Sequence, residues 1–272
     1  MPPLPNIDGV RLATPADLER IALVAAAAFF WSPTFRFQRP QYRSFPADTV
    51  ASYAADYGAA IHDPACAVLV AEDDLDSNET EQVYEALRSA FCSPGQRQRD
   101  IVGVCSLSLK PGSCYTGRFQ PAGHDRARIW PSGKDRRRDQ SVEAMEIYAS
   151  ATNPVKLRYL AGNMRLSTLA VAPAYWRRGH ATRLVRFCTQ VADFDDALLG
   201  ISATPHGMIV AAKAGFQECE TICIAHLTVH EAREDSPEAA DVSLWIGVRL
   251  PCNGSPCSSS ASGTESDPQQ VR

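Results

Sequence analysis

The chain has 272 residues, of which 45% are hydrophobic and 21% charged, so it has the composition of a globular protein and enough length for one elaborated domain. A formal net charge of -4 and an isoelectric point near 5.9 argue against nucleic acid or an anionic membrane as partners. The longest apolar run, residues 21–31, is too short for a membrane-spanning helix, and the acidic residues before it do not fit a signal peptide.

The nine cysteines are scattered without the spacing of a disulfide framework, which favours reduced thiols and a cytoplasmic protein, with a nuclear location left open. A set of four residues, Cys219, Cys223, His226 and His230, superficially resembles a zinc site. On a strand, however, the two cysteines and the two histidines would point to opposite faces and could not converge on one ion. We therefore expect no metal.

Composition predicts disorder at both ends of the chain. Residues 1–8 contain three prolines, and residues 251–272 are mostly Ser, Gly, Pro, Gln and Asp, which leaves residues 9–250 as the folded domain. That domain starts with a strand over Val10 to Ala13, after which Thr14-Pro15-Ala16-Asp17 predicts the start of a helix. The next predicted elements are a helix to Phe30, helical stretches over residues 42–61 and 78–91, and strands over residues 66–71 and 101–109.

Residues 111–163 interrupt this pattern and predict an insertion, with a helix over residues 141–151. The insertion contains a basic cluster, Arg126, Arg128, Lys134, Arg136, Arg137 and Arg138. These side chains form either a solvated loop or a lid over the site, and a lid would favour an acidic acceptor or shield phosphate groups. After the insertion we expect strands over residues 164–171, 198–203, 217–229 and 242–250, with helices over residues 181–192 and from Thr204-Pro205 to Gly215.

The most informative segment runs from Leu169 to Ala181. A strand leads there into Arg177-Arg178-Gly179-His180-Ala181, at the first turn of a helix. Backbone N–H groups at a helix N-terminus are unpaired and lie at the positive end of the helix dipole. Gly179 lets a phosphate approach the main chain, and the two arginines add positive charge. The segment therefore predicts a turn that binds a pyrophosphate.

This segment resembles the signature of the GCN5-related N-acetyltransferase (GNAT) family, which reads Gln or Arg, two residues, Gly, one residue and Gly or Ala, after a strand ending in Val-x-Pro. Trp176 stands at the Gln or Arg position, and the other positions match. The resemblance implies an α/β fold of the α+β kind, with a central twisted mixed β-sheet flanked by helices, an acetyl-CoA cosubstrate and an amine acceptor. The coenzyme-binding residues that it implies are Leu169, Ala170 and Val171 for pantetheine and Arg177, Arg178, Gly179, His180, Ala181 and Thr182 for the pyrophosphate.

A second stretch, residues 203–216, looks like the family's strand, capped helix and terminal Gly-Phe. Ala211 stands where many members have a tyrosine that protonates the leaving thiolate. Thr204 stands where many have an asparagine that contacts the coenzyme, and we expect its hydroxyl to cap the helix instead. The usual general acid is therefore missing.

We expect the amine to attack the thioester directly, without a covalent intermediate, because binding both reactants together supplies much of the barrier reduction. The resemblance suggests a main-chain N–H near Val171 as the donor to the oxygen of the tetrahedral intermediate. The catalytic group stays unassigned, and the weak candidates are His206, Tyr175, Glu146 and His180. Cys188 lies on the apolar face of its predicted helix and is expected to be a core residue.

Two functions are compatible with these residues. An active N-acetyltransferase, monomeric or homodimeric, would acetylate an amine of a small molecule or protein, and it would need neither a metal nor a nucleic acid or membrane partner. A non-catalytic acyl-CoA-binding module is the alternative, because Ala211 and Trp176 depart from the family pattern. A nucleotide-binding protein of another class is disfavoured, since neither the P-loop nor the Gly-x-Gly-x-x-Gly pattern occurs.

Overall fold

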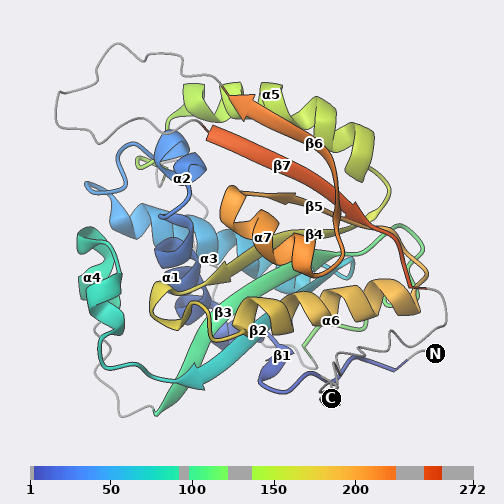
Figure 1. Cartoon of the computed structure of the whole chain (residues 1–272). Coiled ribbons are helices and arrows are strands. Elements are labelled where there is room, and N and C mark those ends of the chain that lie inside the picture. Colours follow the sequence, from blue (N-terminus) through green and yellow to red (C-terminus); the bar gives the residue numbers. More distant parts are fainter. Residues whose placement is uncertain (1–2, 92–97, 122–136, 225–241, 253–272) are drawn as a thin grey trace, which may run out of the picture.

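A computed structural model of the protein describes residues 3–91, 98–121, 137–224 and 242–252, which form one seven-stranded sheet covered by helices (Figure 1). The strand order is β1-β2-β3-β4-β5-β7-β6. Neighbours are antiparallel except for β4 and β5, which are parallel. The strands are β1 Val10–Leu12, β2 Cys66–Asp74, β3 Arg99–Ser108, β4 Met164–Val171, β5 Leu199–Ala203, β6 Gln217–Ile224 and β7 Val242–Arg249. The expected mixed sheet is confirmed.

The helices follow the predicted order along the chain, apart from α2, which the sequence did not predict. They are α1 Leu18–Phe29, α2 Pro33–Gln38, α3 Pro46–His62, α4 Glu85–Phe91, α5 Val142–Leu160, α6 His180–Phe194 and α7 Pro205–Lys213, with short 3-10 turns η1 Pro15–Asp17, η2 Glu79–Gln82 and η4 Pro173–Tyr175. Two predicted stretches are divided in the structure, because residues 42–61 start as a loop before α3 and residues 78–91 form η2 and then α4.

Helices cover both faces of the sheet. On one face α1 and α3 pack against strands β2, β3 and β4 through a core that includes Ile21, Val24 and Tyr57. On the other face α6 packs against the same strands through Leu184, Phe187, Cys188 and Val191, whose spacing of three and four residues forms one apolar stripe. The sheet is therefore buried on both sides near β4.

The far half of the sheet is covered by α5 and α7. Leu244 and Ile246 of β7 lie in a cluster with Val155 and Leu160 of α5, whereas Trp245 lies in the core of the α6 face. Because successive residues of a strand point to opposite faces, α5 covers the face opposite α6 and α7. The predicted helix over residues 141–151 thus extends to Leu160 and buries one end of the sheet.

The ends of the chain were both expected to be disordered. The structure instead packs part of residues 3–8, since Ile7 is buried and the Tyr115 hydroxyl donates to the Pro3 carbonyl at 3.1 Å. In the predicted C-terminal tail, residues 253–272 lie outside the described part of the chain. None of the described helices combines the length and the apolar character that crossing a membrane requires.

The insertion is described only at its two ends, and Arg126, Arg128, Lys134 and Arg136 lie outside the described residues. Arg138 forms a bidentate ion pair with Asp48 of α3, at 2.8 and 2.9 Å. The next residue, Asp139, is fully buried and accepts hydrogen bonds from Arg39 and Thr49. The end of the insertion is therefore anchored to α3 and to the loop before it, and the charge of Arg138 is paired there.

Of the four candidate zinc ligands, the structure describes only the two cysteines, because His226 and His230 lie outside the described residues. Cys219 and Cys223 are free thiols on β6. In the part of the chain that the structure describes, no three His, Cys, Asp or Glu side chains gather closely enough to hold a metal ion.

Candidate functional site

The sheet opens between its parallel neighbours. β4 pairs with β5 only from Met164 to Leu166. At Ser167 the register of β4 against β3 shifts by one residue, which is a β-bulge, and a bulge bends its strand and increases its twist. Ser167, Thr168 and Leu169 are partly exposed although they lie in a central strand with helices on both faces. The bulge therefore separates β4 from β5 and leaves a gap beside the second half of β4.

Main-chain polar groups of β4 face this gap. The Ala172 N–H donates to the Val102 carbonyl at 2.9 Å, so Ala170 and Ala172 direct their polar groups toward β3. Alternate residues, Leu169 and Val171, must direct theirs to the opposite side, where β5 has already diverged. The Val171 carbonyl accepts a hydrogen bond from Trp176 Nε1 at 2.6 Å. The N–H groups of Leu169 and Val171 are then available to a ligand in the gap.

The turn after β4 ends in a helix start without a cap. Gly179 is the N-cap of α6 with φ 86°, and it has no side chain to bond the first N–H groups of the helix. No acidic residue lies in the first turn, and a Cβ built on Gly179 would meet no atom within 4 Å. The N–H groups of His180, Ala181 and Thr182 therefore point into open space at the positive end of the helix dipole. This is the geometry of an anion site.

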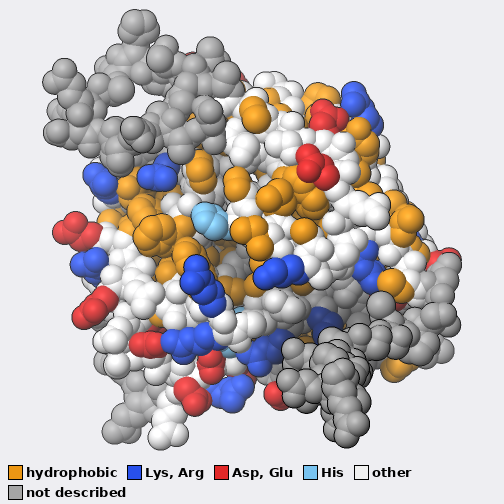
Figure 2. All heavy atoms as spheres, in the orientation of Figure 1, with side chains coloured by type: hydrophobic (Ala, Val, Ile, Leu, Met, Phe, Trp, Pro, Cys, Tyr) orange, Lys and Arg blue, Asp and Glu red, His pale blue; other side chains and the backbone are white. Residues whose placement is uncertain are grey.

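Basic side chains surround this helix start, and Figure 2 shows Lys and Arg gathered over this region of the surface. Arg177 is exposed and adopts φ 63°, in the left-handed region. Arg178 instead turns toward the loop after β2, where it bonds Asp76 at 2.5 Å and lies 3.9 Å from Asp73. The sequence predicted both arginines as phosphate ligands, but only Arg177 lacks a carboxylate partner among the described residues.

His180 is buried beneath the turn and does not face the open side. Its Nδ1 lies 2.8 Å from Arg183 Nη2, and its Nε2 lies 2.9 Å from the Asp73 carboxylate. A guanidinium can only donate, so Nδ1 must accept and Nε2 must carry the proton that Asp73 accepts. Burial lowers the pKa of His180 below its ordinary value of 6.5, against the opposing effect of Asp73. His180 is therefore a neutral side chain that fixes the start of α6 to the end of β2.

The buried His180 predicts a pH-dependent stability. With the native pKa below 6.5, the unfolded chain binds more protons as the pH falls through 6.5, so the free energy of unfolding should decrease below that pH. Urea denaturation between pH 5 and 7.5 measures this slope. His180→Gln should flatten it, whereas His206→Gln, at an exposed position, should leave it unchanged. An equal slope in all three proteins would contradict this account.

The other catalytic candidates are not brought together. Tyr175 is fully buried, burial raises its pKa, and its hydroxyl oxygen accepts from the Asp76 N–H at 2.9 Å. Glu146 is exposed on α5, which covers β6 and β7. His206 is exposed in the first turn of α7. The Thr204 hydroxyl accepts from the Gly207 N–H at 3.3 Å, so the predicted helix cap is confirmed.

Cys188 lies in the core as predicted. Its Sγ is 3.5 Å from that of Cys105 on β3, and both side chains are fully buried. The hydrogen bond between the thiols, together with burial, raises the pKa of Cys105, which disfavours a thiolate. Cys188→Ala should therefore lower the free energy of unfolding by about 1 kcal/mol through lost packing, without reducing the acetyl transfer that the resemblance to the GNAT family implies. Urea denaturation and a thiol-release assay measure the two effects, and loss of transfer with an intact fold would contradict the prediction.

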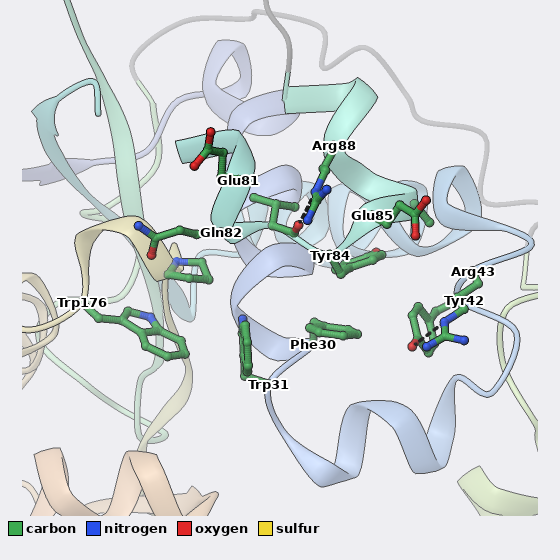
Figure 3. A pocket seen from close by; sticks show the side chains of 13 residues that line it. Phe30, Trp31, Tyr42, Arg43, Glu81, Gln82, Tyr84, Glu85, Arg88 and Trp176 are labelled. Carbon is green, nitrogen blue, oxygen red and sulfur yellow. Dashed lines mark hydrogen bonds between the residues drawn. The ribbon is translucent and has the colours of Figure 1, made fainter. Parts of the chain in front are cut away.

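Two features were not foreseen in the sequence. A chain of hydroxyl groups lies at the bulge, where Thr168 Oγ1 accepts from Tyr57 Oη at 3.0 Å and lies 2.7 Å from Ser106 Oγ. A pocket of about 900 Å³ lies beside the turn, as Figure 3 shows. It is lined by Phe30, Trp31, Tyr42, Arg43, Glu81, Gln82, Val83, Tyr84, Glu85, Ala86, Arg88, Pro173 and Trp176. The aromatic residues of the early helices are the sequence feature that could have indicated this pocket.

These features define a class of protein. A gap along β4 suits an extended chain that can pair with main-chain groups, and the uncapped start of α6 suits a phosphate at the end of that chain. Such an arrangement suits a transferase that uses a phosphate-bearing acyl carrier.

Comparisons with known proteins agree with this class. No protein-family model matches the chain. An acetyltransferase of Stachybotrys chartarum is 29% identical over 220 residues, which is 79% of this chain and 83% of the relative. Two solved structures are similar in fold. One is a Corynebacterium glutamicum protein described as histone acetyltransferase HPA2 and related acetyltransferase (18% identity, TM-score 0.48, 93% of this chain and 99% of that one). The other is yncA, a candidate acetyltransferase of Salmonella typhimurium solved with its cofactor acetyl-CoA (10% identity, TM-score 0.39, 92% and 97%).

The Stachybotrys relative, the order of the mixed sheet and the geometry of the Gly179 turn agree with one another: the chain is similar to acetyltransferases, and its fold is GNAT-like.

Proposed function

We propose that the protein transfers the acetyl group of acetyl-CoA to a primary amine of a small molecule or protein, by direct attack of the amine on the thioester. The observation that carries this proposal is the continuity of two open main-chain surfaces. The gap-facing side of Leu169 to Val171 leads through η4 to the uncapped N-terminus of α6. Acetyl-CoA supplies an activated acetyl group on an extended arm that ends in a pyrophosphate, which matches both surfaces.

Each part of the chain has a role in this mechanism. The N–H groups of residues 179–182 bind the pyrophosphate, and Arg177 adds a positive charge. Leu169 and Val171 pair with the pantetheine arm along the gap. The Val171 N–H donates to the thioester oxygen as negative charge develops there, because a fixed donor stabilises that charge without reorganisation. Trp176 holds the Val171 carbonyl and thereby fixes the orientation of this peptide group.

Proton transfer has no dedicated side chain in this proposal. Ala211 is buried on α7, so it offers neither an acid nor a base. The attacking amine must lose its proton, and water in the gap is the simplest acceptor. The leaving thiolate of CoA then takes a proton from solvent, and no enzyme–acetyl intermediate forms. A cytoplasmic location and a monomeric or homodimeric state stay predictions.

Calorimetric titration with acetyl-CoA, followed by a thiol-release assay over a panel of amines, tests the proposal. Saturable binding with amine-dependent release of CoA is the expected result. Binding without release across small amines, polyamines and lysine peptides would favour the non-catalytic acyl-CoA-binding module. Absence of binding would overturn the proposal.

A further inference from the structure

The pocket beside the turn adjoins the reactive end of the gap. Trp176 lines the pocket and at the same time donates to the Val171 carbonyl, at 2.6 Å. Pro173 of the same turn also lines the pocket. The Trp176 side chain therefore lies between a molecule in this pocket and the main chain of Val171. The pocket has the size of a small-molecule site. Its lining residues come from three segments of the chain: before β2, between β2 and β3, and after β4.

Aromatic side chains line one part of its walls and charged or polar side chains another, as Figure 3 shows. Trp31 and Trp176 are 47% and 44% exposed, and their rings meet edge to face with centroids 5.9 Å apart. Phe30 and Tyr84 stack with centroids 4.5 Å apart. Two neighbouring tryptophans that remain half exposed are unusual on a folded surface, and they offer flat faces to a ring or a cation. The walls thus favour an aromatic, positively charged ligand.

The charged residues of the pocket divide into two groups. Arg43 donates through Nε to the Tyr42 hydroxyl at 3.1 Å, and Arg88 donates through Nε to the Val83 carbonyl at 3.0 Å, so both are held against the wall by neutral acceptors and keep their positive charge. Glu81 and Glu85 are exposed, and neither has an ion-pair partner among the described residues. Glu81 belongs to η2, which contacts the η4 turn that carries Pro173. A carboxylate is therefore available near the gap.

One polar group in the aromatic wall has no partner in the described part of the chain. The Tyr84 side chain is buried, 7% exposed, and its hydroxyl makes no hydrogen bond to any described residue. Buried hydroxyl groups are nearly always paired, so this one is open to a further hydrogen bond. A bound ligand can provide it.

We propose that this pocket is the acceptor site and that the acceptor is an arylalkylamine, a primary amine joined to an aromatic ring by a short alkyl chain. This inference rests on the proposed function. The ring packs among Trp31, Phe30 and Tyr84, and the protonated amine is attracted to Glu81 before it loses its proton and attacks near Val171. The acceptor is thus determined by the end of α1, with Phe30 and Trp31, together with the segment from η2 to α4 between β2 and β3.

Matched amines test the ring preference. In the thiol-release assay kcat/KM for 2-phenylethylamine should exceed that for 2-cyclohexylethylamine by about tenfold, because the two have similar size and basicity and only one can stack. Trp31→Ala should raise KM for 2-phenylethylamine by about tenfold and abolish this preference, and Trp31→Phe should restore most of both. Phe194→Ala, which removes a side chain of similar exposure (49%) at the far end of α6, should change neither.

A binding measurement separates this proposal from the proposed function. Calorimetric titration of the CoA-saturated protein with 2-phenylethylamine should show saturable binding that Trp31→Ala weakens. If acetyl-CoA binds and is turned over, but spermidine or a lysine peptide is preferred and Trp31→Ala does not change KM, the acceptor proposal is overturned while the acetyltransferase stands. If acetyl-CoA does not bind, the proposed function itself fails.

Discussion

Gly179→Glu should weaken acetyl-CoA binding by ~100-fold or more, since a carboxylate at the start of α6 repels the pyrophosphate and competes for N–H groups that would otherwise bind it. Two hydrogen bonds to a charged group, each contributing about 1.5 kcal/mol, account for a change of this size. The left-handed φ of 86° adds a cost in folding stability of about 1–2 kcal/mol for any residue with a Cβ. Calorimetric titration measures the affinity, and urea denaturation measures the stability.

A matched control separates the two effects of this substitution. Gly112 has a similar φ of 73°, and a Cβ built there also meets no atom within 4 Å. Gly112→Glu should therefore lose a similar amount of stability while binding acetyl-CoA normally. Equal loss of affinity in both variants would mean that Gly179 acts only through the fold, and the phosphate site would have to lie elsewhere.

Asp139→Ala should lower the free energy of unfolding by about 3–5 kcal/mol, because it leaves a buried guanidinium without its counter-charge. Asp139 is fully buried and Arg39 is 9% exposed, with its guanidinium packed over the ring of Tyr53 at 5.0 Å. Besides Asp139, Arg39 bonds the Ser52 hydroxyl at 2.7 Å, which cannot replace a carboxylate. Urea denaturation measures the loss.

Two further variants show whether pairing, rather than packing, is responsible. The Arg158–Glu220 pair at 3.3 Å has side chains that are 63% and 36% exposed, so Glu220→Ala should cost at most about 1 kcal/mol. Adding Arg39→Met to Asp139→Ala should recover much of the lost stability, since no unpaired charge is then buried. A double variant as unstable as Asp139→Ala alone would show that Asp139 is needed for another reason.

The sequence identified those parts of the protein in which neighbouring residues determine the structure. The apolar spacing of Leu184, Val185, Phe187 and Cys188 predicts one face of a helix, and that face is buried as α6. Gly179 before the helix and Thr204-Pro205 before the next one mark helix starts through their own backbone preferences and hydrogen bonds. These signals are contained in a few consecutive residues, so the turn at Gly179 and the two helix starts could be predicted without the fold.

The orientation of the predicted ligands could not be read in the same way. Arg178 and His180 stand beside Gly179 in the sequence, yet both turn to Asp73 and Asp76, about 100 residues earlier in the chain. The residues next to Arg178 and His180 in the sequence do not determine the orientation of these side chains. Ion pairing and burial depend on tertiary contacts with residues that are distant in the sequence. The same holds for Tyr175, whose hydroxyl accepts a hydrogen bond from the Asp76 N–H.

By itself the sequence predicted most of the order of strands and helices, the Gly179 turn and the resemblance to the GNAT family, since each depends on local spacing or a short motif. Only the tertiary structure decided where β4 separates from β5, which arginine stays free and where an acceptor could bind. The bulge at Ser167 exists through pairing with β3, and the pocket brings together Trp31 and Trp176, which are 145 positions apart in the sequence. Contacts of that range arise from packing of the whole sheet, which no local pattern encodes.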